Sequence, residues 1–170
     1  SLIQAGEIKS ALPAVEPAYQ WLADHMAFLA HDAVVWNYQF DHVYNDVMIK
    51  APWQSAIGQA YVLRALQQAV LEKRVKPPLD YEDMLVKGSR TYTIRTEDGG
   101  VQSVNRFGNV FYEEVPNNTH ILNAHLVSTL VLGELYHYSG EVWHRELFEQ
   151  GLQTLHTHLH LYDTGYWLRY

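Results

Sequence analysis

Residues 119–160 read THILNAHLVSTLVLGELYHYSGEVWHRELFEQGLQTLHTHLH, and this stretch decides the fold class. Its apolar residues recur at helical spacing in two runs. We expect one helix from Thr119, as its cap, to about Tyr138, and a second from Glu141 to about His160. Only Ser139-Gly140 separates them. Helices joined by so short a connection lie antiparallel as neighbours, so the stretch predicts a helical hairpin.

The chain before this hairpin predicts three further helices. Apolar and aromatic residues at helical spacing favour helices over Ser10–His31, from Pro52 to about Lys73, and from Leu79 to about Arg95. Prolines lie in the opening turns or at the boundaries of these segments, where a helix tolerates them.

Two segments depart from the helical pattern. Residues 34–50 break the period, and we expect an irregular loop lined with aromatic side chains. Residues 101–104 and 109–112 predict two short strands around a turn at Asn105–Gly108, giving one small β-hairpin near residues 100–112. The sequence therefore predicts a mainly α fold of antiparallel helices with one hairpin, in a single domain over residues 1–170.

The composition narrows the class of protein. It is 48% hydrophobic and 18% charged, which is typical of a globular domain. The formal net charge is -7 without a dense Lys/Arg cluster, so we expect no nucleic-acid partner. The absence of Cys excludes disulfides and a cysteine nucleophile. No apolar run approaches the roughly 18 residues of a membrane span, and the start at Ser1 shows no signal pattern, so the sequence does not determine localisation.

The segment from Phe111 to Pro116, Phe-Tyr-Glu-Glu-Val-Pro, holds the leading candidate for chemistry. Adjacent carboxylates on an extended strand point to opposite faces, so only one of Glu113 and Glu114 can enter a given cleft. Aromatic and aliphatic neighbours desolvate a carboxylate and raise its pKa, which suits it to proton transfer. A solvated pair of acids at a strand end is the alternative interpretation.

The C-terminal histidines offer a candidate metal site. On a helix, His156 and His160 share a face, and Glu149 or Asp163 would have to complete the ligand set. The alternative is a polar helix face near a C-terminal end, where His suits the helix dipole. We expect no metal.

Five segments, taken in their order along the chain, form a recognisable set. They are Pro52-Trp53-Gln-Ser55-Ala56-Ile-Gly-Gln59-Ala60, Glu97-Asp-Gly-Gly-Val101, Tyr112-Glu113-Glu114-Val115-Pro116, Ile121-Leu122-Asn123 and Leu161-Tyr-Asp-Thr-Gly165. This ordered set resembles motifs of the D-glucuronyl C5-epimerase family. The resemblance implies a helical α/α-toroid domain, here in a partial arrangement. It also implies inversion at carbon 5 of glucuronic acid within an acidic polysaccharide such as heparosan, without a cofactor.

The resemblance also assigns roles by position. Glu114 corresponds to the family's catalytic Glu, Asn123 to a substrate-contacting Asn, and Tyr170 to an active-site Tyr. The remaining expected site residues are Tyr112 or Tyr166 as a second phenol, Arg169 or Arg106 for the uronate carboxylate, and Trp53 as a further sugar contact.

The sequence departs from the family at several places. Ala124 replaces a Gly after the Asn, and the second helix is about one turn shorter than the family's. Val115 stands where the family has a catalytic Tyr, and the family's Asp-Leu-Arg continuation lies beyond Tyr170. Two alternatives to an epimerase therefore stay open, a non-catalytic carbohydrate-binding remnant and a polysaccharide lyase or hydrolase on the same scaffold. A homodimer and a partner domain outside this chain are both compatible with the resemblance.

Overall fold

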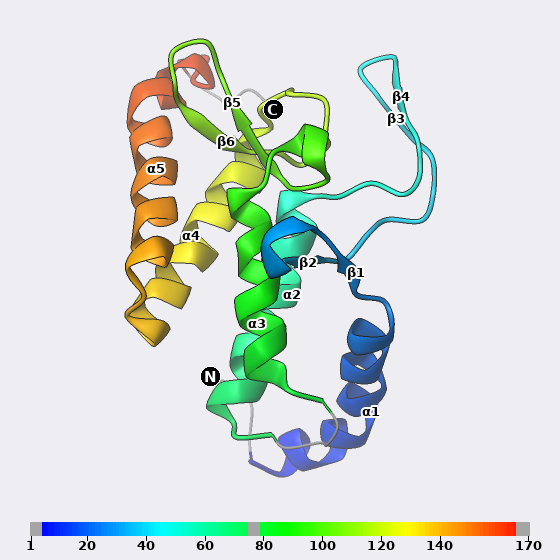
Figure 1. Ribbon diagram of the computed structural model, residues 1–170. Helices are drawn as coiled ribbons and strands as arrows, with labels where there is room; N and C mark the ends of the chain where they lie inside the picture. Colours follow the sequence, from blue (N-terminus) through cyan, green and yellow to red (C-terminus); the bar gives the residue numbers. More distant parts are fainter. Residues whose placement is uncertain (1–4, 75–78, 166–170) are drawn as a thin grey trace.

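The computed structural model describes residues 5–74 and 79–165, and it is mainly α-helical (Figure 1). Its α-helices are α1 (Ala5–Asp24), α2 (Ala56–Leu71), α3 (Tyr81–Ser89), α4 (Leu122–Ser139) and α5 (Val142–His158). Four 3-10 turns accompany them, at Ala30–Asp32, Arg90–Thr93, Thr96–Asp98 and Leu159–Leu161. The prediction of a mainly α fold is confirmed. The toroid arrangement stays a prediction.

Helix α2 packs against both α3 and α4, and α4 packs in turn against α5 (Figure 1). Leu63 of α2 and Leu132 of α4 are completely buried, and burying such a side chain contributes about 2 kcal/mol relative to exposing it. The α4–α5 contact is close, because a Cβ added at Gly151 would come within 2.4 Å of Thr129 Oγ1. The helical hairpin predicted from residues 119–160 is therefore confirmed, and Gly140 ends α4 in the left-handed conformation (φ 70°).

Several predicted helix boundaries are wrong. Helix α2 begins at Ala56 instead of Pro52, because Ser55 caps it by accepting the Gly58 N–H, and α3 ends at Ser89 instead of about Arg95, where a 3-10 turn follows.

Helix α1 ends at Asp24. A ring nitrogen of His25 bonds to the Trp21 carbonyl (2.8 Å), so this side chain satisfies one carbonyl of the last helical turn. Residues 27–28 instead form strand β1, which pairs antiparallel with β2 (residues 34–35). Helix α4 begins after Ile121, and the predicted cap Thr119 donates instead to Asn117 Oδ1 (2.8 Å).

The predicted β-hairpin is present. Strands β5 (Gln102–Val104) and β6 (Val110–Tyr112) pair antiparallel, with Gln102 opposite Tyr112. Asn105 closes the turn, since its side-chain oxygen accepts the backbone N–H groups of Phe107 (2.9 Å) and Asn109 (3.0 Å). The hairpin lies over one end of α4 and α5.

A second hairpin occupies part of the segment that was predicted to be irregular. Strands β3 (His42–Tyr44) and β4 (Val47–Ile49) pair antiparallel, and the hairpin projects from the helical body (Figure 1). Asn45 and Asp46 form its turn with φ of 48° and 62°. Asn and Asp tolerate this left-handed conformation, which two-residue hairpin turns require. The prediction of an irregular loop over 34–50 is corrected accordingly.

Candidate active site

The two acidic residues that follow β6 have different surroundings. The side chain of Glu113 is fully buried and is a hydrogen-bond acceptor for Ser103 Oγ, the His120 backbone N–H (3.0 Å) and His120 Nδ1 (2.6 Å). Tyr162 donates to the His120 carbonyl and closes this network from the C-terminal side. Glu113 therefore anchors the loop between β6 and α4.

Glu114 is partly buried and lies beside Asn123 in the first turn of α4. Burial raises the pKa of the Glu114 carboxyl group above its ordinary value, against smaller opposing effects of a hydrogen bond from Asn123 and the charge of His42. The Oε2 atom of Glu114 is shielded from solvent and has no hydrogen-bond partner among the described residues. Such a carboxylate favours holding a proton, which is the property that proton transfer needs.

The orientation of Asn123 follows from its other contact. Its side-chain Oδ1 accepts the backbone N–H of Ala124 (2.8 Å). The amide NH₂ group is therefore the end that donates to the Glu114 carboxylate. The structure thus brings together two residues, Glu114 and Asn123, that the sequence predicted as parts of one site.

A small second core holds the β3–β4 hairpin against this loop. Ile49, Trp53, Val115 and Ile121 are buried together in it. Val115, which occupies the position of the family's catalytic Tyr, is 2% exposed, so its side chain belongs to this core. Because Val115 is packed in this core, the preceding residue, Glu114, is held close to the segment that carries Trp53.

Trp53 lies beneath the surface instead of on it. Its side chain is 6% exposed and its indole N–H donates to the Phe40 carbonyl (2.8 Å). The expected direct sugar contact of Trp53 is therefore replaced by a supporting position under other rings, which are Tyr38, Phe40 and His42.

Tyr112 occupies the main core. It is completely buried, its hydroxyl donates to the Leu147 carbonyl (2.6 Å), and burial raises the pKa of its phenol well above the ordinary value. A phenol held in this way does not reach the partly exposed side where Glu114 lies. The structure therefore assigns Tyr112 to the packing of the main core.

The other predicted site residues divide into two groups. Arg106 lies at the turn of the β5–β6 hairpin with its guanidinium 4.7 Å from the centre of the Phe107 ring, at the opposite end of β6 from Glu114. From Asn109, after the turn, to Glu114 the chain spans roughly 17 Å. Tyr166, Arg169 and Tyr170 lie outside the described residues.

His156 and His160 do not lie on one face of a single α-helix, so that prediction is wrong. Helix α5 ends at His158, and His160 lies in the following 3-10 turn. His158 bonds to Asn105 Nδ2 (3.1 Å) through Nε2. Over residues 5–74 and 79–165, no group of three His, Cys, Asp or Glu side chains has the arrangement of a metal site.

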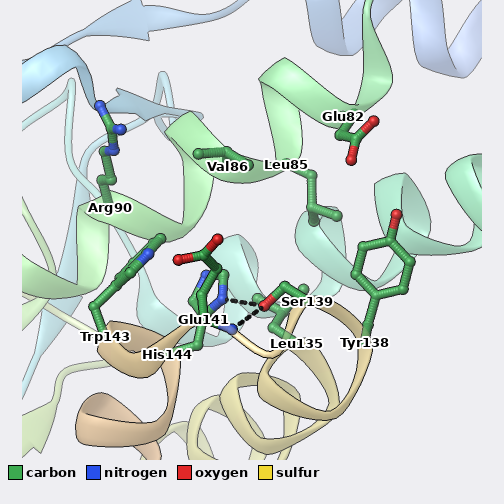
Figure 2. A pocket seen from close by; sticks show the side chains of 10 residues that line it. All are labelled: Glu82, Leu85, Val86, Arg90, Leu135, Tyr138, Ser139, Glu141, Trp143 and His144. Carbon is green, nitrogen blue, oxygen red and sulfur yellow. Dashed lines mark hydrogen bonds between the residues drawn. The ribbon is translucent and has the colours of Figure 1, made fainter.

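A cavity of about 430 Å³ lies elsewhere, between α3 and the α4–α5 connection (Figure 2). Trp143, Tyr138 and Arg90 are among its lining residues, and the buried His144 bonds to Ser139 Oγ (2.9 Å) and Ser89 Oγ (3.0 Å). Burial lowers the pKa of His144 to about 4, so it is neutral. Ser139 and Asn123 stand near opposite ends of α4, roughly 24 Å apart along its axis, so this cavity is separate from the Glu114 site.

Sequence reasoning missed His42 as a neighbour of Glu114. The available signal was the alternation of Tyr38, Phe40, His42 and Tyr44, which is typical of an extended chain with one face of rings. Because residues 34–50 were expected to form an irregular loop, this alternation was not interpreted as a row of rings on one face.

The fold and the site together define a helical domain with a shielded carboxylate beside an aromatic surface. The family model described as D-glucuronyl C5-epimerase C-terminus matches residues 30–170. The chain belongs to this family, as the sequence motifs predicted.

Two relatives extend this finding. The chain is 27% identical to an uncharacterized protein of Methanocaldococcus jannaschii over 81% of its own length and 44% of that protein. It is 29% identical to a D-glucuronyl C5-epimerase of Caenorhabditis elegans over 66% of its own length and 20% of that protein. The chain thus spans less than half of each of these relatives. In the described part of the chain, no helix is both long and apolar enough to cross a bilayer.

Proposed function

We propose that this chain epimerises uronic acid residues of a polysaccharide at carbon 5, with Glu114 as a proton-transfer residue. The observation that carries the proposal is the environment of Glu114. Its carboxylate atom Oε2 is shielded from solvent and has no hydrogen-bond partner among the described residues, and burial raises the pKa of the group. Family membership supports the reaction class.

The chemistry explains why such a carboxylate is needed. The proton at carbon 5 is adjacent to a carboxylate, so its removal places a second negative charge beside the first. Hydrogen-bond donors and positive groups must stabilise that developing charge. Inversion also needs one group that takes the proton from one face of the ring and a second that returns it on the other face.

Glu114 is the proposed group on one face. The hydrogen bond from Asn123 holds its carboxylate in place, and the buried Glu113 network fixes the loop that carries it. Tyr170 is the proposed second group, as the family resemblance implies. The uronate carboxylate is proposed to bind Arg169, and Tyr166 is the alternative phenol for the second face.

Solvent exchange tests the proposal directly. The 170-residue chain is incubated with heparosan in deuterated water, and deuterium at carbon 5 of the uronic acid is measured by mass spectrometry. Glu114→Gln should lower the exchange rate by about 100-fold or more, because a positioned acid–base group contributes that much. Glu149→Gln, which removes the same charge from the surface of α5, is the matched control and should exchange as the unaltered chain does. Undiminished exchange by Glu114→Gln would falsify the proposed role.

A non-catalytic carbohydrate-binding protein is the second candidate function. It is favoured by the burial of Val115 in the small core, where the family has a catalytic Tyr. Binding of heparosan without any exchange at carbon 5 in the unaltered chain would support it. An unsaturated, ultraviolet-absorbing product would instead indicate a lyase.

A further inference from the structure

Three aromatic side chains form a surface beside Glu114 that the motifs did not assign. Tyr38 forms an isolated antiparallel bridge with Trp53, the chain bends at Phe40, and His42 begins β3. The rings of Tyr38, Phe40 and His42 all pack on Trp53, with centroid distances of 4.6, 5.7 and 5.6 Å. We call Tyr38, Phe40, His42 and the underlying Trp53 the aromatic platform.

The platform has a fixed base and an open upper side. Trp53 is 6% exposed, whereas Phe40 is 54% and Tyr38 is 37% exposed. Backbone hydrogen bonds join Tyr38 to Trp53 in both directions (2.8 and 3.2 Å), and the indole N–H is bound to the Phe40 carbonyl. The exposed rings therefore stand on a preorganised support, and a ligand would not have to order them on binding.

The platform is continuous with the Glu114 site. Trp53 shares the small core with Val115, the residue after Glu114. The Ala56 backbone N–H donates to the Glu113 carbonyl (2.7 Å), which ties the end of the platform segment to the residue before Glu114. His42 lies close enough for its charge to act on Glu114.

We propose that the aromatic platform is a sugar-binding subsite that holds a pyranose residue of the polysaccharide next to the uronate at Glu114. Exposed aromatic faces match the C–H face of a pyranose ring, and the phenol of Tyr38 and the imidazole of His42 match its hydroxyl edges. The carboxylate of Asp41 is paired with Lys50, so the local charge is balanced and does not repel an acidic chain. The inference rests on the proposed function, because it concerns the neighbouring sugar of the same substrate.

The composition of the hairpin argues for a sugar over a protein partner. The exposed ion pair of Asp41 and Lys50 lies next to the rings of the platform, whereas the core of a stable subunit interface is depleted in charged groups. The apolar side of the hairpin is the other one, where Val43 and Met48 are paired across the strands and are 55% and 51% exposed.

Chain-length dependence tests the subsite. Binding of uronic-acid oligosaccharides from disaccharide to octasaccharide is measured by calorimetry for the unaltered chain, Phe40→Ala, Phe40→Trp and Phe107→Ala. The unaltered chain should bind longer oligosaccharides more tightly. Phe40→Ala should lose about fivefold to tenfold in affinity for the longer ones and little for the disaccharide, the size expected for one aromatic contact. Phe40→Trp should keep the gain.

Phe107→Ala is the matched control, since Phe107 is a 71% exposed ring on the turn of the other hairpin. Its affinities should equal those of the unaltered chain. Thermal unfolding of Phe40→Ala confirms that the variant folds, as the half-exposed position of Phe40 leads us to expect.

The subsite is overturned if the unaltered chain shows no length dependence, or if Phe40→Ala binds all lengths as Phe107→Ala does. A change in oligomeric mass of Phe40→Ala by light scattering, without a change in sugar affinity, would assign the platform to a protein contact and also overturn it. Exchange at carbon 5 is followed in the same samples. If affinity still rises with oligosaccharide length but no exchange occurs at carbon 5, the proposed function is contradicted and the proposed subsite is not.

Discussion

Glu113 and Glu114 are adjacent in the chain, yet the side chain of Glu113 is fully buried against His120 and that of Glu114 is partly exposed beside Asn123. The alternation of an extended chain places the two carboxylates on opposite sides. One side is a hydrogen-bonded anchor within the protein, and the other is the candidate reaction centre. Stability and activity should therefore depend on different members of this pair.

Glu113→Gln should destabilise the fold by about 2 kcal/mol, because a glutamine cannot accept all the donors that Ser103 and His120 present. Glu114→Gln should change the free energy of unfolding by no more than about 0.5 kcal/mol. Urea denaturation of both variants measures the difference. Equal losses in the two variants would contradict the separation of roles.

Asn123→Ala should move the pH dependence of carbon-5 exchange. The hydrogen bond from Asn123 lowers the pKa of Glu114, so its loss raises that pKa further. Since the base must be ionised, exchange increases as the pH rises through the Glu114 pKa, and the acidic limb should shift to higher pH in the variant. A pH–rate profile with the same acidic limb in both proteins would show that the bond does not tune Glu114.

Tyr112→Phe should cost about 1 kcal/mol of stability and leave exchange at carbon 5 within about twofold, because its hydroxyl donates to Leu147 inside the core. Thermal unfolding and the exchange assay measure the two effects. A loss of exchange far larger than the loss of folded protein would return Tyr112 to the site.

Acid should unfold the protein through two buried histidines. His125 Nδ1 accepts the Tyr112 backbone N–H (3.1 Å) and Nε2 bonds to the Gly151 carbonyl (3.1 Å), so a second ring proton would face another donor. Burial lowers the pKa values of His125 and His144 to about 4. Between about pH 6.5 and 4 the unfolded chain binds more protons than the folded one, so stability falls as the pH falls through this window.

The expected loss is on the order of 3 kcal/mol for each histidine over that window. Urea denaturation at pH 7.5, 6 and 5 measures it, and His125→Gln should reduce the dependence by about half, since His144 remains, while lowering stability at pH 7.5. A free energy of unfolding that stays constant from pH 7.5 to 5 would rule out this mechanism.

The helices were predictable because their signals are local. Apolar spacing located α2 to α5, and Ser139-Gly140 marked the break between α4 and α5. The β3–β4 hairpin was missed because its strands are three residues long and its turn, Asn45-Asp46, lacks glycine. Strands this short do not stand out from a loop unless the turn carries a signal such as glycine, as the equally short β5–β6 hairpin does at Gly108.

The sequence by itself determined the mainly α class and the family. It also predicted the candidate centre at two adjacent carboxylates, Glu113 and Glu114, of which the family resemblance selects Glu114. Only the tertiary structure decided that Glu113 is the anchor and that Trp53 supports other rings from below. The reason is physical: hydrophobic periodicity acts between neighbours along the chain, whereas burial and hydrogen bonding of a side chain depend on partners distant in sequence. Glu114 acquires its raised pKa through burial by such surroundings, and no local pattern of residues encodes them.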